Sequence, residues 1–173
     1  KFYLLFTTLD EGGYLLTTTD IEGEWEKKKL NDGFYDCGLL FDNDKIYVVY
    51  GINQLRIAEL DEDFNKIPGS DKDVVKWSFR EGLEGSRLYK IGEYYYIYST
   101  YGGWPAFQTV FRSKDIYGPY EEKKLIDDDN IHQGALVETQ TGEWWTMLFY
   151  DKGAYGRFPN LQPVKWVDGW PEI

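Results

Sequence analysis

One pattern recurs three times along the chain at a constant spacing of 48 residues. Each copy opens on a polar head residue, continues through small residues and an apolar pair, makes a polar turn, and ends in a β-branched or aromatic strand. The heads are Asp36, Glu84 and His132, and the segment Phe2–Thr7 repeats the aromatic strand without a head. A strand-built repeat of about 40–50 residues is typical of a β-propeller, in which each repeat forms one four-stranded blade.

The residues between the heads predict strands and turns throughout the chain. No segment shows a convincing helical period over about ten residues, so we predict an all-β fold. The charged stretches Glu26–Leu30 and Glu121–Leu125 are expected to form outer edge strands, because charge on an edge strand opposes aggregation. Residues 61–73 are polar, include Pro68-Gly69, and are expected to form a loop. The other expected strands are Lys1–Thr8, Tyr14–Thr19, Phe34–Phe41, Ile46–Tyr50 and Leu55–Leu60.

Composition excludes several classes of partner. Aromatic residues reach 18% of the chain, which favours strands, and aromatic faces also suit sugar rings. The formal net charge of −11 argues against binding to nucleic acid or to an anionic membrane, since both require a basic patch. No apolar run approaches the roughly 20 residues of a membrane-spanning helix. The single cysteine, Cys37, can form no internal disulfide, so secreted, periplasmic and cytoplasmic locations all stay open.

The three head residues are the candidate functional residues. The first strand of each propeller blade lines the central axis, so residues at one repeat position form a ring at one mouth of the channel. Asp36, Glu84 and His132 should therefore converge, although on their own the two acids could simply cap strand ends. Two carboxylates facing one cavity suit glycoside hydrolysis, which needs one protonated acid and one ionised acid. A neighbouring carboxylate and desolvation both raise the pKa of the protonated acid.

Four ordered stretches of the chain resemble glycoside hydrolase family 43. They are YDCGLLFDNDKIYVVYG, EGSRLYKIGEYYYIYSTYGGWP, HQGALVETQTGEWW and GRFPNLQPVKWVDGWP. The resemblance implies a five-bladed β-propeller that acts on arabinoxylan or its oligosaccharides, as an α-L-arabinofuranosidase or a β-xylosidase. It also implies inversion of configuration through three acids. The preference between arabinofuranosides and xylosides stays open.

The resemblance assigns roles to individual residues. Glu84 is implied to be the general acid, and Asp36 the acid that orients Glu84 and tunes its pKa. His132 is implied to lie near the axis, where family members often hold a calcium ion through a histidine and water molecules. No organic cofactor is expected.

The resemblance also implies the residues that contact the pentose-containing substrate. Arg157 resembles the arginine that contacts the sugar in the subsite for the non-reducing end. Tyr35 and Gln133 are expected substrate contacts because each lies next to a head residue. Trp104, in the Gly-Gly-Trp-Pro loop, is expected to form a sugar platform at the rim of the site.

The third acid of the family, the general base, has no counterpart by register. One 48-residue period before Asp36 falls ahead of Lys1, so we interpret residues 1–173 as an N-terminally truncated, partial catalytic propeller of about three to four blades. The first blade and part of the second are expected to be absent. The chain is then a fragment of a longer enzyme, receives the missing blade from another chain, or is inactive. It is expected to self-associate or to pair with a complementing N-terminal segment, because an open propeller has unpaired strand edges.

Two other classes of protein are compatible with a propeller. A non-catalytic carbohydrate-binding propeller would bind sugar without hydrolysing it, and the missing base favours this alternative. An interaction scaffold of the WD-repeat kind would show its own signature in every blade, which this sequence lacks.

Overall fold

The computed structural model describes residues 1–76, 81–103, 105–126 and 131–173, and these residues form four antiparallel sheets. The first sheet contains β1 (Phe2–Thr8), β2 (Gly12–Thr18) and β3 (Glu26–Lys29). The second contains β4 (Gly38–Asp42), β5 (Lys45–Tyr50), β6 (Gln54–Leu60) and β7 (Lys72–Lys76). The third contains β8 (Leu83–Ile91), β9 (Tyr94–Tyr101), β10 (Phe107–Ser113) and β11 (Glu121–Lys124). The fourth contains β12 (Ile131–Glu138), β13 (Trp144–Asp151), β14 (Arg157–Val167) and β15 (Trp170–Glu172).

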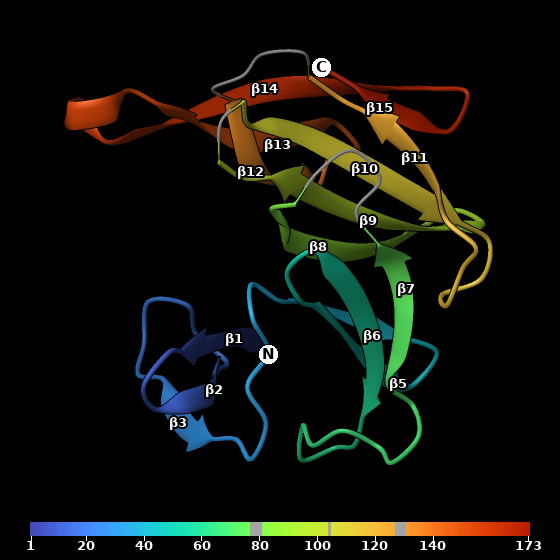
Figure 1. The fold of residues 1–173 in the computed structure, drawn as a ribbon. Helices are drawn as coiled ribbons and strands as arrows, with labels where there is room; N and C mark the ends of the chain where they lie inside the picture. The colour runs from blue at the N-terminus through green and yellow to red at the C-terminus, as the bar shows by residue number, and fades with distance from the viewer. Residues whose placement is uncertain (77–80, 104, 127–130) are drawn as a thin grey trace.

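Each sheet is one propeller blade. Its strands pair in chain order, and Figure 1 shows the four sheets following one another from the blue sheet at the lower left to the red sheet at the top. The short 3-10 helix η1 (Gly153–Tyr155) lies at the tip of the hairpin between β13 and β14. No helix within the described residues is long and apolar enough to cross a membrane. The expected all-β, partial propeller of three to four blades is therefore confirmed.

The hydrophobic core consists of three layers, one between each pair of consecutive blades. Leu15 and Leu30 of the first blade pack with Val48 and Ala58 of the second. The second and third blades share Tyr47, Val49, Leu55, Ile57, Leu83, Leu88, Ile97 and Phe111, and the third and fourth share Tyr96, Tyr98, Val110, Leu136, Leu148 and Val164. Each inner blade therefore buries both of its faces, which is why its strands are apolar on both sides.

Gly38, the first residue of β4, lets β4 lie directly against β8, and Gly134 in β12 leaves room for β13 of its own blade. A Cβ atom at Gly38 would lie 2.8 Å from the Cα atom of Arg87 and 2.8 Å from the carbonyl oxygen of Ser86. A Cβ atom at Gly134 would meet the carbonyl oxygen of Met147 and lie 2.6 Å from Cδ2 of Leu148. The small residues that follow each head in the sequence thus permit backbone contact near the axis.

Two boundaries differ from the sequence-based expectation. The strand predicted over Phe34–Phe41 begins only at Gly38, because Asp36 has a left-handed backbone with φ of 46° that interrupts an extended strand. The loop predicted over 61–73 ends earlier, since β7 already begins at Lys72. The edge strand β7 was not predicted, because its alternation is short and its flanking residues are charged.

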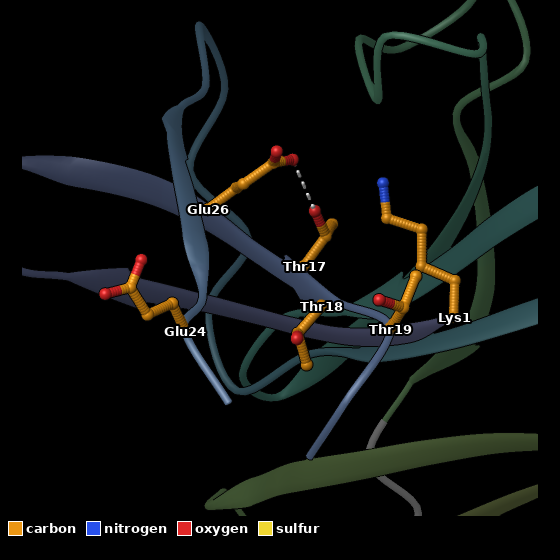
Figure 2. A pocket seen from close by; sticks show the side chains of 6 residues that line it. All are labelled: Lys1, Thr17, Thr18, Thr19, Glu24 and Glu26. Atoms are coloured by element: carbon orange, nitrogen blue, oxygen red, sulfur yellow. Dashed lines mark hydrogen bonds between the residues drawn. The ribbon is translucent and has the colours of Figure 1, made fainter. Parts of the chain in front are cut away.

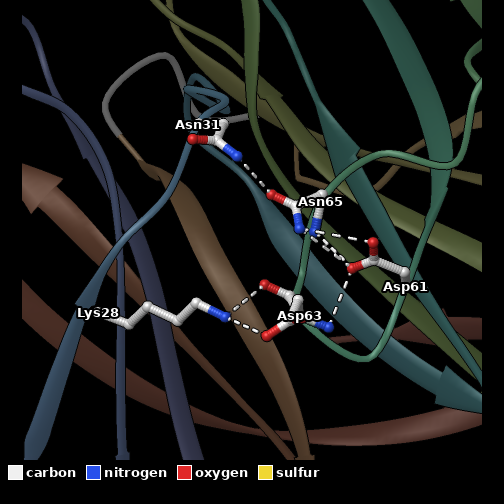
Figure 3. A network of polar contacts seen from close by, with 5 residues as sticks. All are labelled: Lys28, Asn31, Asp61, Asp63 and Asn65. Atoms are coloured by element: carbon white, nitrogen blue, oxygen red, sulfur yellow. Dashed lines mark hydrogen bonds and ion pairs between the residues drawn. The ribbon is translucent and has the colours of Figure 1, made fainter.

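A polar network attaches the first blade to the loop that follows β6. The ammonium group of Lys28 donates to the carboxylate of Asp63 at 2.5 Å, and the side chain of Asn31 donates to that of Asn65 at 3.0 Å. Asp61 accepts the backbone N–H groups of Asp63 and Asn65, both at 2.9 Å, and so holds this loop in shape (Figure 3). These contacts are exposed and therefore contribute little to the free energy of folding. We attribute to them a role in aligning the first two blades.

Replacing a residue between blades should destabilise the fold far more than replacing a matched exposed residue. Ile57→Ala removes a fully buried side chain from the layer between the second and third blades and should lower the free energy of unfolding by about 2–5 kcal/mol. Ile52→Ala, at a half-exposed position, should change it by less than about 1 kcal/mol. Denaturant titration of both variants measures the difference. Equal losses would contradict an inter-blade core at this position.

Candidate active site

The structure places the three head residues at the same end of the inner strands. Glu84 begins a β-bulge in β8, where the pairing with β9 shifts between Glu84 and Arg87. His132 begins a similar bulge in β12, where the pairing with β13 shifts before Ala135. Asp36 lies in the turn just before β4. Glu84 still pairs with Thr100 and His132 with Phe149, and the bulged residues are the two that follow each of these heads.

Asp36 and Glu84 lie on segments that are hydrogen-bonded to each other. The N–H group of Ser86, inside the bulge after Glu84, donates to the carbonyl oxygen of Asp36 at 3.1 Å. The guanidinium group of Arg87 donates to the carbonyl oxygens of Cys37 and Ser86, at 3.0 and 2.9 Å. One arginine therefore ties the turn that carries Asp36 to the bulge that follows Glu84.

The side chain of Glu84 is held from two sides. The hydroxyl group of Tyr35 donates to Oε2 of Glu84 at 3.0 Å. This hydrogen bond, with burial and the nearby carboxylates, raises the pKa of Tyr35 to about 12, so the phenol keeps its proton and acts as a donor. On the other side Gly102 leaves the space that Oε1 fills, since a Cβ atom at position 102 would overlap it.

Asp36 is contacted from the fourth blade. The side-chain amide of Gln133 donates to Oδ2 of Asp36 at 3.3 Å. Gln133 has a left-handed backbone with φ of 50°, and a Cβ atom at Gly85 would lie 2.9 Å from its Cγ atom. The bulges of β8 and β12 therefore pack against each other, and Asp36, Glu84 and Gln133 meet where three blades come together.

His132 is buried and lies beside Arg157. Its ring packs against that of Phe149 on β13, with ring centroids 4.4 Å apart. Arg157, on the neighbouring strand β14, places its guanidinium carbon 4.5 Å from the centroid of the same phenyl ring. Burial lowers the pKa of His132, and the Arg157 charge lowers it further, so the imidazole is neutral at pH 7. Nδ1 of His132 is buried and has no hydrogen-bond partner among the described residues.

Two hollows meet at Arg87. One of about 290 Å³ is bordered by Arg87, Gln133, Phe149 and neighbouring residues of the fourth blade. A smaller one of about 140 Å³ is bordered by Arg87, Asp36 and part of β1. A third hollow, of about 200 Å³, lies on the first blade and contains none of the head residues. There the carboxylates of Glu24 and Glu26 point to different sides, so they do not form a facing pair (Figure 2).

Most of the predicted site residues are brought together. Tyr35 is hydrogen-bonded to Glu84, and Gln133 to Asp36. His132 and Arg157 both contact the ring of Phe149. Trp104 lies outside the described residues. Burial raises the pKa of the Cys37 thiol to about 11, which agrees with a packing role and not with a nucleophile. Within the described ranges, no group of three or more His, Cys, Asp or Glu side chains is arranged to hold a metal ion.

Sequence reasoning missed three residues that shape the site. Arg87, Phe149 and Gly102 occur outside the shared repeat position and carry no motif of their own. Gly102 belongs to the Gly-Gly-Trp-Pro loop, which the sequence suggested would present Trp104. The structure shows that its glycine also makes room for Glu84. The offset of Arg87 from Glu84 could have suggested a place near the axis, but not its hydrogen bonds to the Asp36 turn.

Asp36 and Glu84 thus stand on hydrogen-bonded segments of adjacent blades of a β-propeller. Glycosyl hydrolases family 43 matches residues 1–171, and the chain belongs to this family. A putative beta-xylosidase of Xylanibacter ruminicola is 29% identical over 99% of this chain and 35% of its own length. A non-reducing end alpha-L-arabinofuranosidase of Bacteroides ovatus is 26% identical over 99% of this chain and 38% of its own length.

Solved structures show the same arrangement of blades. A bifunctional GH43-CE protein of Bacteroides eggerthii superposes with a TM-score of 0.88 at 35% identity, over 98% of this chain and 24% of that chain. A xylan beta-1,4-xylosidase of Bacillus halodurans superposes with a TM-score of 0.78 at 28% identity, over 93% of this chain and 37% of that chain. The chain thus spans well under half the length of these relatives.

Filling the space beside Glu84 should destabilise the protein in a way that depends on Glu84 itself. Gly102→Ala places a methyl group on Oε1 of Glu84 and should cost about 1–3 kcal/mol of unfolding free energy. Adding Glu84→Ala should recover most of that loss, because the overlapping carboxylate is gone. Gly33→Ala is a matched control, since its added Cβ would contact only a methyl group of Thr7, at 3.2 Å.

Denaturant titration of the four proteins completes this double-mutant cycle. Additive losses for Gly102→Ala and Glu84→Ala would show that the Glu84 carboxylate does not occupy the space beside Gly102.

Proposed function

We propose that residues 1–173 carry the acid half of a site that hydrolyses β-xylosides or α-L-arabinofuranosides of arabinoxylan-type glycans. The proposal draws on relatives named beta-xylosidase and alpha-L-arabinofuranosidase. One observation carries it. Asp36 and Glu84 stand on hydrogen-bonded segments of adjacent inner strands, and each side chain is held by a polar neighbour.

In this proposal Glu84 is the general acid. Its carboxyl group protonates the glycosidic oxygen as the bond to the anomeric carbon breaks. Tyr35 holds one oxygen of Glu84, and the other lies in the space left by the glycine at position 102. The carboxyl group is therefore fixed in direction before substrate binds, which is the condition for efficient proton transfer.

Asp36 acts through Glu84. Asp36 lies on the segment that is hydrogen-bonded to the bulge after Glu84, and the amide of Gln133 keeps its carboxylate in place. Inversion requires a third carboxylate, roughly 6.5–9.5 Å from the acid, to activate water on the other face of the sugar. The family resemblance assigns that role to a third acid, which neither Asp36 nor Glu84 supplies.

Arg157 is proposed to contact the sugar at the non-reducing end. Its guanidinium group stays exposed beyond the ring of Phe149, beside the tip of the β13–β14 hairpin. Five N–H donors in a fixed plane suit the vicinal hydroxyl groups of a pentose. Tyr35, Gln133 and Trp104 remain predicted substrate contacts beside it.

The acid assignment predicts a specific loss of turnover. Glu84→Gln should reduce hydrolysis of aryl β-xylosides and aryl α-L-arabinofuranosides by about 10²-fold or more, because the amide cannot donate the proton. Glu93→Gln, an exposed change at the β8–β9 turn, should leave turnover unchanged. Release of the aryl group is measured for both substrates, and calorimetry measures binding of xylose and arabinose.

The same assay separates hydrolysis from sugar binding alone. Equal and measurable rates for the wild type and Glu84→Gln would remove Glu84 as the acid. Sugar binding without turnover by the wild type would favour the second candidate, a non-catalytic carbohydrate-binding propeller.

A calcium ion at the axis is proposed through His132. The supporting observation is its buried Nδ1, which has no partner among the described residues, on an imidazole whose lowered pKa keeps it neutral. Since no cluster of three or more metal-binding side chains accompanies it in the described part of the chain, water would complete the shell. When bound, the ion would supply positive charge near the sugar hydroxyl groups.

Calcium binding can be tested without activity. Calcium at millimolar concentration should raise the Tm of the wild type, because a ligand that binds only the folded state stabilises it. His132→Ala should abolish the increase, whereas Glu143→Gln, an exposed change in the β12–β13 turn, should retain it. A wild-type Tm that is the same in calcium and in chelator would contradict the proposal.

A further inference from the structure

Ser99 on β9 faces the bulge that follows Glu84. The pairing of β8 with β9 includes Glu84 on one side of the bulge and resumes at Arg87 on the other, so two residues of β8 lie opposite Ser99 alone. The side chain of Ser99 is fully buried inside the third blade, so it is not itself a contact for a sugar. Any effect of Ser99 on the site must therefore pass through the bulge.

The hydroxyl groups of Ser86 and Ser99 form a hydrogen-bonded chain that ends on the backbone of Glu84. The Ser99 hydroxyl donates to the carbonyl oxygen of Glu84 at 2.7 Å, and the two serine hydroxyl oxygens are 3.0 Å apart. A serine hydroxyl has one proton and a carbonyl oxygen can only accept, so Ser86 donates to Ser99 and Ser99 to Glu84. Because both serines are fully buried, loss of the Ser99 hydroxyl would leave Ser86 without its acceptor and the Glu84 carbonyl without this donor.

Both ends of this hydroxyl chain are anchored. The side-chain amide of Gln108, a fully buried residue of β10, donates to the carbonyl oxygen of Ser99 at 2.5 Å. At the other end the N–H group of Ser86 donates to the carbonyl oxygen of Asp36 at 3.1 Å. A continuous polar chain therefore runs from β10 through β9 to the bulge of β8 and on to the turn before β4. The backbone of Glu84 is held at the centre of this chain.

We propose that Ser99 is a positioning residue for the general acid and acts through the backbone of Glu84. This rests on the proposed function, in which Glu84 donates the proton. A bulge disrupts the regular ladder that would otherwise fix the backbone, and the backbone sets the direction of the side chain. One oxygen of Glu84 must meet the Tyr35 hydroxyl while the other enters the space left by Gly102. Displacement of a reacting group by about 1 Å can lower turnover about 10²-fold.

The hydrogen bond from Tyr35 to Glu84 reports the position of the carboxylate without any turnover. The ¹³C resonance of Tyr35 Cζ, assigned by its loss in Tyr35→Phe, is recorded at neutral pH. In the wild type Glu84→Gln should shift this resonance, because the phenol then no longer donates to a carboxylate. In Ser99→Ala the resonance should already be displaced, and adding Glu84→Gln should have little further effect. Thr109→Val removes an equally buried hydroxyl, which bonds to β11, and should retain the full response to Glu84→Gln.

Aryl xylosides with different leaving groups test whether this position matters to proton transfer. A dinitrophenyl group leaves as a stable anion with little help from an acid, whereas a phenyl group must take the proton of Glu84 on its oxygen as the glycosidic bond breaks. Ser99→Ala should lower kcat for the phenyl xyloside by about 10-fold or more and leave kcat for the dinitrophenyl xyloside nearly unchanged. Thr109→Val should lower neither. An equal loss on both substrates in Ser99→Ala would indicate a structural role alone and overturn the proposal.

The two measurements separate this proposal from the proposed function. A wild type that hydrolyses neither substrate would defeat the proposed function for this chain, and the Tyr35 resonance would still decide whether Ser99 positions Glu84. A full response to Glu84→Gln in the Ser99→Ala protein would overturn the positioning role, whatever the activity. Circular dichroism verifies that each variant is folded. If Ser99→Ala is not, Ser99→Cys replaces it, because a thiol is a much weaker donor than a hydroxyl.

Discussion

The close approach of the inner strands is the constraint on which the rest of this structure depends. β4 can lie against β8 only because residue 38 is a glycine, which brings the carbonyl oxygen of Asp36 within reach of the Ser86 N–H group. A larger residue there would push the two blades apart and separate the segments that carry Asp36 and Glu84. The packing of the blades and the geometry of the site are therefore one problem, solved by the same small residues.

The site is built from positions where the backbone departs from regular structure. Asp36 and Gln133 are left-handed, and Glu84 and His132 each open a bulge. Such conformations cost free energy and persist only where the surroundings hold them. Here the surroundings are Arg87, which bonds to both neighbouring segments, and the contact between Gly85 and Gln133. Side chains held in this way need little reorganisation when a substrate arrives, which suits a proton donor.

Much of the fold follows from patterns that are local in the sequence. The 48-residue spacing predicts repeated blades, the charged segments predict outer strands, and the shared register predicts that Asp36, Glu84 and His132 lie at one end of the inner strands. The pairs within the site could not be predicted in this way. Tyr35 with Glu84 and Gln133 with Asp36 lie 49 and 97 residues apart, and such contacts depend on the angle between blades. The later start of this strand, at Gly38 and not at Phe34, could not be predicted either, because the composition of Phe34–Cys37 does not exclude an extended conformation.

The sequence by itself determined the class of fold, the number of repeats and the residue types that gather at the axis, because period, alternation and turn residues act over short stretches of chain. Only the tertiary structure decided which neighbour holds each carboxylate, that Gly102 makes room for Glu84, and that His132 is buried against Phe149. It also decided which apolar residues remain uncovered, since Met147 and Tyr98 look alike in their repeats and differ only in whether a further blade lies beside them. The physical reason is that burial is a property of the neighbouring layer, which no single repeat encodes.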